Sequence, residues 1–247
     1  MQIGLIGSGN MARAMARGWG RPVLCADPFA ERAQALAAEL GGEALASNAE
    51  VAQQADLVVL CHKPAQLAAV AVEVAPHAKA VVSILGGVSL ADVEAAYPGK
   101  PVYRFIPSLP VEVRQGAVVQ AKPSGGEMDA AVAELFAELG TLVVLEDRLV
   151  DLATALMSCA PAYVALVAEA QIDAGVRRGM PAAQGAELVV QTLAGTAELI
   201  RRRGYDTLAI RREVSSPGGM TAKGLDALER GGVRAAFSDA LDAVLGD

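Results

Sequence analysis

The chain has 247 residues, of which 53% are hydrophobic and 4% aromatic, and its formal net charge is −7. This composition excludes a disordered chain, and the negative charge gives no long-range attraction for nucleic acid or an anionic membrane. The three cysteines are widely spaced and lack any Cys-x-x-Cys pattern, which supports neither a disulfide framework nor a metal site. No basic segment precedes the first apolar residues, and the apolar runs fall short of a membrane span, so we expect a cytoplasmic protein.

The chain opens with the pattern of a short strand, a glycine turn and a helix. The letters GSGNMA fit the spacing G-x-G-x-x-A. Gly7 permits a tight turn, Gly9 lets the backbone approach a pyrophosphate, and Ala12 allows the helix to pack closely on the strand. The amides where the helix begins, around Asn10 and Met11, favour a bound phosphate. The alternative is a strand-to-helix turn without a ligand.

A second expected strand, residues 22–26, ends in an acidic residue. Asp27 follows Gly7 by twenty positions, where a carboxylate can accept both ribose hydroxyls of NAD. Together with the glycine turn, it predicts a dinucleotide site. Asp27 would repel a 2′-phosphate and so favours NADH, while Arg32, close in sequence, leaves NADPH open.

Strand and helix patterns alternate through the N-terminal half. Helices are expected at 30–40, 51–55, 65–74 and 90–97, and strands at 57–61, 80–85 and 102–106. The segments 117–121 and 142–145, which flank a helix at 128–139, complete the sheet. This order predicts an α/β domain, residues 1–147, with a doubly wound parallel sheet.

Ligands of such sheets lie beyond the carboxyl ends of the strands. Two further loops then join the site: one with His62, Lys63 and Pro64, and one at 107–110 that contains Ser108. His62 could act as a general acid, but no acidic partner lies nearby in sequence to fix its tautomer. We therefore favour a loop whose backbone follows the cofactor ribose. Lys63 could contact a phosphate or the substrate.

The C-terminal residues 148–247 show helical patterns only. Helices are expected at 148–179, with a kink or break at Pro161, and at 181–203, 208–214, 218–230 and 233–245. The apolar stripe through Ala165, Ala168, Ile172 and Val176 predicts burial against a second subunit. The alternative is a monomer with a well-packed interior.

The stretch SSPGGMT lies between two of these helices. We expect Ser216 to cap a helix that begins at Pro217, with Gly218 and Gly219 in its first turn. Glycine is unfavourable inside a helix, so two in succession indicate a ligand against the backbone, and a carboxylate would suit the free amides. Thr221 can offer a hydroxyl to the same ligand. The alternative is a flexible loop between helices.

These motifs resemble those of the pyrroline-5-carboxylate reductase family nearly end to end. The likeness rests on the opening IGLIGSGNMARAMARG, Lys63-Pro64, GGV at 86–88, the Pro-x-x-Pro loop at 107–110, PAY at 161–163 and EVSSPGGMTAKGLDALERGGVRAAF. It implies a Rossmann domain followed by a helical substrate-binding domain that interlocks with a partner into dimers and often larger rings. It also implies NADH- or NADPH-dependent reduction of the cyclic imine 1-pyrroline-5-carboxylate to L-proline, the last step of proline biosynthesis.

The resemblance assigns roles within the C-terminal half. The amides of Gly218 and Gly219 would hold the substrate carboxylate, Thr221 would hydrogen-bond the imine side as the catalytic residue, and Ser216 would support the loop. Ala160 would line the substrate pocket.

Several positions depart from the family pattern. Residues 158–160 are Ser-Cys-Ala where the family usually has Gly-Ser-Gly. Ser108-Leu109 replaces the usual Asn-Thr, and Ile106 replaces the usual Met. These changes leave two alternatives: a reductase of a related cyclic imine acid, such as a six-membered one, and a non-catalytic nucleotide-binding paralogue.

Overall fold

The computed structural model describes residues 1–123 and 125–246. The chain forms two compact units, Met1–Pro161 and Ala162–Asp247. The boundary after residue 147, which the change of sequence pattern suggested, stays a prediction.

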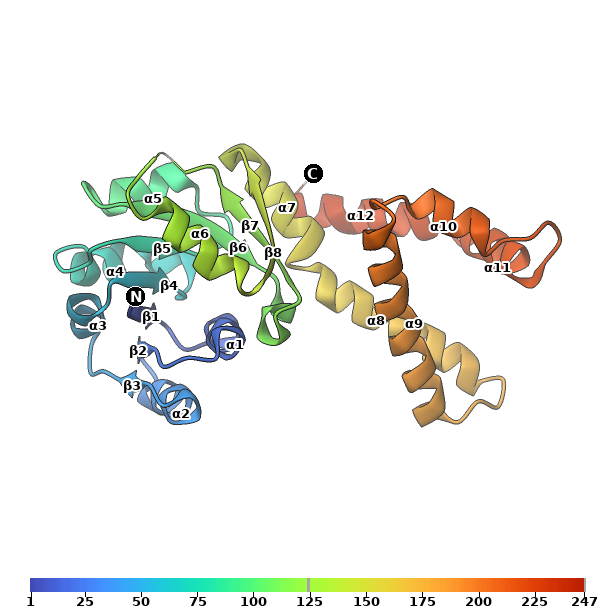
Figure 1. Ribbon diagram of the computed structural model, residues 1–247, viewed down its shortest axis with the longest axis horizontal. Coiled ribbons are helices and arrows are strands. Elements are labelled where there is room, and N and C mark those ends of the chain that lie inside the picture. The colour runs from blue at the N-terminus through green and yellow to red at the C-terminus, as the bar shows by residue number, and fades with distance from the viewer. Residues whose placement is uncertain (124, 247) are drawn as a thin grey trace. The chain divides into compact units, whose positions relative to one another are not determined.

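An eight-stranded sheet forms the centre of the first unit, with the order β3-β2-β1-β4-β5-β6-β7-β8 (Figure 1). The strands are β1 (Ile3–Ile6), β2 (Leu24–Ala26), β3 (Glu43–Ala44), β4 (Leu57–Leu60), β5 (Val81–Ser83), β6 (Val102–Pro107), β7 (Gly116–Ala121) and β8 (Gly140–Leu145). The α/β class and the doubly wound order of the first strands are confirmed.

One pair of strands differs from the all-parallel expectation. β6 and β7 are antiparallel, with Ile106 opposite Val119, whereas the other neighbouring pairs are parallel. Only residues 108–115 join these two strands, and they contain a short 3₁₀ helix, Leu109–Val113. A parallel crossover needs a dozen or more residues, so this connection can only return the chain in the opposite direction.

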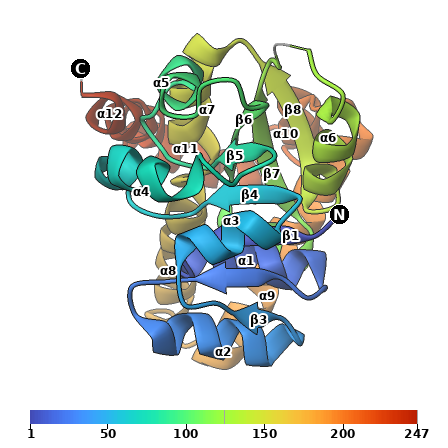
Figure 2. The same ribbon diagram turned by 90° about the vertical axis from the view of Figure 1, so that its left-hand side faces the viewer.

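Helices cover both faces of the sheet (Figures 1 and 2). They are α1 (Asn10–Trp19), α2 (Ala30–Leu40), α3 (Asn48–Gln54), α4 (Leu67–Val74), α5 (Leu90–Ala96), α6 (Asp129–Ala137) and α7 (Val150–Met157). One apolar cluster includes residues of α1, α2 and α6, and a second includes residues of α3, α4 and α5. The first cluster contains a stacked aromatic pair, Phe105 and Phe136, whose ring centroids lie 4.1 Å apart. Burial of these two clusters fixes the sheet whose strand ends carry the site.

A buried arginine ties β6 to α7. The side chain of Arg104 is 1% exposed, and its Nη1 lies 2.8 Å from Oδ1 of Asp147, while Nη2 contacts Asp151. A buried guanidinium needs such partners because an unpaired buried charge is strongly destabilising. The pairs therefore hold α7 at the end of the strand.

The second unit consists of helices, α8 (Ala160–Val176), α9 (Ala182–Arg202), α10 (Thr207–Glu213), α11 (Met220–Arg230) and α12 (Val233–Leu245) (Figure 1). The long helix expected at 148–179 is interrupted between Met157 and Ala160. Pro161 falls in the first turn of α8, where its missing N–H costs no helical hydrogen bond. The proline thus marks a helix start.

This second unit leaves many apolar side chains uncovered. Large exposed residues include Val164, Leu166, Leu188, Val190 and Phe237. The segment Asp147–Val176 is long and apolar enough to cross a membrane, with a mean hydropathy of 1.6. The sequence patterns did not predict a segment of this kind. Only 11% of its apolar window is buried within the chain. These faces need a covering that one copy of the described chain does not supply.

Candidate dinucleotide and substrate site

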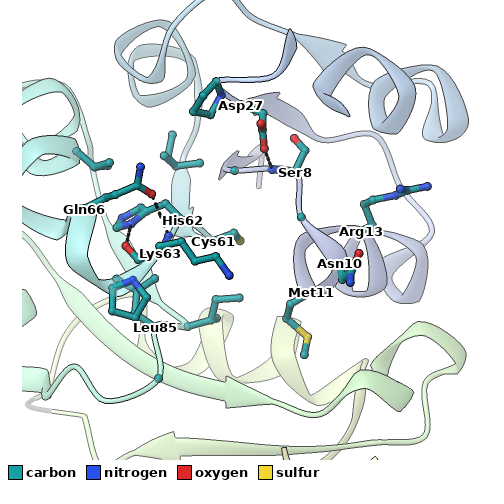
Figure 3. Close-up of a pocket in the computed structure, with 18 of the residues that line it drawn as sticks. Ser8, Asn10, Met11, Arg13, Asp27, Cys61, His62, Lys63, Gln66 and Leu85 are labelled. Carbon is teal, nitrogen blue, oxygen red and sulfur yellow. Dashed lines mark hydrogen bonds between the residues drawn. The ribbon is translucent and has the colours of Figure 1, made fainter. Parts of the chain in front are cut away.

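A cavity of about 930 Å³ opens beyond the carboxyl ends of the parallel strands (Figure 3). Its walls come from the loops after β1, β2, β4 and β5, and from Ile106 and Pro107 at the end of β6. Thr154 and Ser158, from α7 and the residues after it, also line the cavity. This is the edge of a doubly wound sheet at which nucleotides bind.

Most of the residues predicted to bind the cofactor lie on this cavity. They are Gly7, Gly9, Asn10, Met11, Asp27, Lys63 and Pro64. Their contacts with a cofactor stay predictions, but the fold brings them together from three separate loops.

Ser108 is placed differently. Its side chain is buried, its hydroxyl accepts a hydrogen bond from the amide of Ala117 at 2.9 Å, and it is not among the residues that line the cavity. The hydroxyl therefore serves the β6–β7 connection. The sequence could not reveal this, because Ala117 becomes its partner only when the two strands pair.

The glycine turn has the geometry expected of a phosphate loop. Gly7 has φ 101°, and a Cβ there would lie 3.0 Å from the carbonyl oxygen of Cys61. Gly9 is the N-cap of α1 and has no side chain to cap it, while a Cβ built at Gly9 would meet no atom within 4 Å. The free amides in the first turn of α1 therefore lie beside the uncovered backbone of Gly9, which leaves room for a bound anion.

Asp27 is held in place by two backbone amides. Its Oδ2 accepts a hydrogen bond from the amide of Ser8 at 2.7 Å, and its Oδ1 accepts one from the amide of Phe29 at 2.9 Å. The carboxylate thus links the glycine turn to the loop after β2. A carboxylate oxygen can accept more than one hydrogen bond, so both oxygens retain capacity for ribose hydroxyls.

His62 forms part of the wall opposite Ser8 and Arg13 in Figure 3. Its Nδ1 lies 2.8 Å from the carbonyl oxygen of Lys63, and because a carbonyl can only accept, Nδ1 carries the hydrogen. Burial lowers the pKa of His62 below its ordinary 6.5, an effect that the bond to Lys63 opposes. At neutral pH its Nε2 therefore carries no proton to donate, which argues against a general-acid role.

Other lining residues were not predicted from the sequence. Thr154 and Ser158 reach the cavity from α7 and the turn after it, and the Ser158 hydroxyl donates to the carbonyl oxygen of Pro107 at 3.3 Å. In the sequence, Ser158 stands out only as a departure from the family pattern. Arg13 lines the cavity from the first turn of α1. The sequence signal for Arg13 is its place directly after the glycine motif.

The SSPGGMT stretch folds differently from the expected cap. The amide of Gly219 donates to the carbonyl oxygen of Ser216 at 3.0 Å, and Gly218 has φ 71°. Pro217 and Gly218 thus occupy the central positions of a β-turn, for which Pro-Gly is favoured. Helix α11 begins only at Met220, with Gly219 as its N-cap.

The turn changes which amides are available to a carboxylate. The amide of Gly219 is occupied by the carbonyl oxygen of Ser216, whereas the first turn of α11, which begins at Met220 and includes Thr221, offers further free amides. The predicted contact of the Gly218 amide with the substrate stays a prediction. Thr221 is exposed, and Ala160, the first residue of α8, is half-buried. The contacts of both with a substrate stay predictions.

Unpartnered polar atoms gather at the cavity. Among the described residues, Ser8 Oγ, Arg13 Nε and His62 Nε2 are buried without a hydrogen-bond partner, and all three residues line it. Buried polar groups are normally paired, so such a cluster indicates a site that a polar ligand completes. The open backbone at Gly9 and the anchored Asp27 fit the pyrophosphate and ribose of a dinucleotide.

The fold and the site define a dinucleotide-binding protein of the Rossmann type. A family model described as pyrroline-5-carboxylate reductase dimerisation matches residues 147–246, and one described as NADP oxidoreductase coenzyme F420-dependent matches residues 2–87. A pyrroline-5-carboxylate reductase from Thermus thermophilus is 36% identical over 255 residues, covering 98% of this chain and 95% of that protein.

Two solved structures are also similar over nearly the whole chain. The 1-pyrroline-5-carboxylate reductase of Streptococcus pyogenes has a TM-score of 0.90 at 30% identity, covering 100% of this chain and 97% of that one. The pyrroline carboxylate reductase of Plasmodium falciparum, solved with NADP bound, has a TM-score of 0.89 at 26% identity, covering 99% and 95%. The chain belongs to the pyrroline-5-carboxylate reductase family of NAD(P)H-dependent oxidoreductases.

Proposed function

We propose that this chain reduces 1-pyrroline-5-carboxylate to L-proline and prefers NADH as the hydride donor. The observation that carries the proposal is the open backbone cradle at Gly9 beside a carboxylate, Asp27, that two amides hold in place. A nicotinamide cofactor bound there supplies the hydride. The remaining task of the protein is to hold the two reactants in a productive geometry.

The substrate needs little acid–base help from the protein. A protonated cyclic imine is already electrophilic, so the two electrons of the hydride form the new C–H bond, and the C=N π electrons return to nitrogen as its lone pair. The nitrogen keeps its own proton, and the product is a secondary amine. A neutral, inward-facing His62 without an acidic partner agrees with such a reaction, which requires no general acid at this site.

The proposal gives two segments separate tasks. The first turn of α1 binds the pyrophosphate, and Asp27 binds the adenosine ribose. The first turn of α11 binds the substrate carboxylate, and the Thr221 hydroxyl accepts a hydrogen bond from the protonated imine nitrogen. The exposed position of Thr221 in the second residue of α11 supports this role, because its hydroxyl is free of the core.

The preference for NADH rests on Asp27. A 2′-phosphate carries nearly two negative charges at neutral pH, and a fixed carboxylate at the ribose site repels it. Both oxygens of Asp27 are tied to backbone amides, so the side chain cannot easily swing away. The P. falciparum relative was solved with NADP bound, so the preference proposed for this chain rests on its own Asp27.

We further propose that the exposed apolar faces of α8 and α9 pack against a second copy of the chain. The match to the dimerisation family over residues 147–246 supports a homo-oligomer built through these helices. The same burial accounts for the apolar segment Asp147–Val176 without a membrane. Three free cysteines also suit a reducing cytoplasm.

Replacing Thr221 with alanine tests the substrate side of the proposal. We expect the variant to lose most of its imine reduction while its NADH dissociation constant stays within about twofold, because one lost polar contact in a transition state costs roughly 1–3 kcal/mol. Thr207→Ala, at the start of α10, is the matched control and should keep full turnover. Unchanged turnover in Thr221→Ala would remove that residue from the reaction.

A further inference from the structure

We propose that Ser158 is a specificity-determining residue. Its side chain narrows the hydride-transfer end of the cavity, so that a five-membered cyclic imine fits better there than its six-membered homologue. The proposal rests on the proposed function, because it concerns the substrate of the same reaction. It gives a task to a position at which this chain departs from the family pattern, with serine in place of the usual glycine.

The strand order determines which end of the cavity receives the nicotinamide. β1 leads into the glycine turn, and its neighbour β2 leads to Asp27, the proposed ribose ligand. A dinucleotide spans the crevice at which the strand order reverses, so its other half lies on the side of β4, β5 and β6. Figure 3 shows Asp27 at one end of the cavity and Met11 and Leu85 toward the other. The imine that accepts the hydride must lie at this second end.

Ser158 lies on the wall of that second end. The wall there also includes Ile106 and Pro107, from the end of β6, and Thr154, from α7. The Ser158 hydroxyl donates a hydrogen bond to the carbonyl oxygen of Pro107 at 3.3 Å, which joins the end of α7 to the end of β6. The side chain therefore takes up space beside the strand end that a ring stacked on the nicotinamide approaches.

Contacts on both sides hold this part of the wall in place. The backbone amide of Ser158 donates to the carbonyl oxygen of Thr154 at 2.9 Å, and the buried ion pairs of Arg104 tie α7 to β6. Directly after the strand end, the amide of Ser108 donates to the carbonyl oxygen of Ala117 at 2.9 Å. Because the wall cannot easily recede, a ring that is too large must be crowded, and crowding a packed site is costly.

The hydroxyls on this wall act on a ligand chiefly through their volume. The Thr154 hydroxyl donates to the carbonyl oxygen of Val150 at 2.7 Å, just as the Ser158 hydroxyl donates to Pro107. A hydroxyl has a single hydrogen, so neither group has one left for a ligand. The neighbouring side chain of Ile106 has no polar atom. What Ser158 adds to this end of the cavity is therefore a fixed obstacle.

One extra ring methylene is a difference that such an obstacle can detect. An apolar site typically separates ligands that differ by one methylene by about 10- to 200-fold. Replacing Ser158 with glycine removes Cβ and Oγ, two atoms, and so frees more room than the one additional ring carbon occupies. We therefore expect the parent to reduce the five-membered imine with a kcat/KM at least about tenfold above that for the six-membered imine.

Steady-state reduction of the two imines by the full chain with NADH tests the proposal. Ser158→Gly should lower the five-to-six ratio of kcat/KM by about tenfold, chiefly by lowering the KM of the six-membered imine. Ser158→Ala, which keeps Cβ, should lower the ratio by less. The KM for NADH should stay within about twofold in both variants.

Ala75→Gly is the matched control. Ala75 in α4, like Ser158 in α7, is a helix C-cap with right-handed helical backbone angles, and it does not line this cavity. The exchange makes the same loss of Cβ at a helix end, so any effect of added backbone freedom appears in the control as well. The five-to-six ratio should not change.

An unchanged ratio in both Ser158 variants would overturn the proposal. So would an equal change for both imines together with a changed KM for NADH, because Ser158 would then only support the cofactor. Binding of L-proline and of its six-membered homologue to the chain with NADH bound, measured by calorimetry, reports ring size without turnover, and its ratio should shift in the same direction. Failure of the proposed function looks different: the parent reduces neither imine, while Ser158→Gly still shifts the ratio of the two dissociation constants.

Discussion

Replacing Gly9 with alanine should disable cofactor binding without disturbing the fold. Gly9 has φ −72° and ψ −174°, a conformation open to alanine, and an added Cβ would meet no protein atom within 4 Å. Alanine restricts the unfolded chain, which stabilises by about 0.4–1 kcal/mol, but it is a poorer N-cap than glycine by a similar amount, so the two effects offset and stability should change by less than about 1 kcal/mol. In the complex, however, the methyl group would occupy the space through which the pyrophosphate approaches the amides of α1.

Loss of one amide–phosphate hydrogen bond, worth about 1.5–3 kcal/mol, corresponds to roughly 10- to 150-fold weaker binding of NADH and of NADPH alike. Quenching of protein fluorescence on titration gives both dissociation constants, and thermal unfolding checks the fold. Gly195→Ala, in α9, makes the same exchange at another open position and should leave binding unchanged. Wild-type affinity in Gly9→Ala would refute the placement of the pyrophosphate.

Three further changes test other parts of the account. Asp27→Ser should weaken NADH and strengthen NADPH in steady-state kinetics, each by several-fold because a charged acceptor and a repulsion are both removed, and an unchanged NADH/NADPH ratio would exclude Asp27 from cofactor choice. Gly18→Ala should destabilise the chain by about 1–3 kcal/mol or more in urea unfolding, since its Cβ would lie 2.2 Å from the carbonyl oxygen of Val111; a wild-type midpoint would contradict that contact. As pH falls below 6.5, His62 takes up a proton more readily in the unfolded chain than in the folded chain, where burial lowers its pKa, and this lowers the free energy of unfolding. The His62→Gln variant should therefore lose less of that free energy between pH 7 and pH 5 than the parent. Equal losses would contradict the burial of His62.

Local patterns predicted the individual elements well. The helices Ala30–Leu40 and Val233–Leu245 begin and end where the sequence indicated. Both follow from apolar periodicity, and both are followed by a glycine in the left-handed conformation. The strand–turn–helix around the glycine motif could be read for the same reason, because its signals lie within a dozen residues.

Features that depend on distant partners were not predictable in this way. The antiparallel turn of β6 into β7 depends on the length of one connection, and the two-residue strand Glu43–Ala44 is too short to show a pattern. Ser108 and Thr154 illustrate the limit for the site, since one was expected on the cavity and is not there, and the other was not expected and is. Side-chain direction at a strand end is fixed by packing from other elements, which a linear sequence does not display.

The turn at residues 216–219 shows how two local rules can compete. Serine before proline suggested a helix cap, but Pro-Gly is also the favoured centre of a β-turn, and the structure adopts the turn. The left-handed conformation of Gly218 is incompatible with a helical first turn. Helix α11 therefore begins later than the sequence suggested.

The central claim is tested most directly by steady-state oxidation of NADH and NADPH by the purified protein, with 1-pyrroline-5-carboxylate and with its six-membered homologue as substrates. We predict strong turnover of the five-membered imine, faster at low cofactor concentration with NADH than with NADPH. Turnover of the homologue alone would contradict the proposed substrate and indicate a related imine reductase. Silence with both imines, despite measurable nucleotide binding, would contradict the proposed reaction and indicate a nucleotide-binding protein without catalysis.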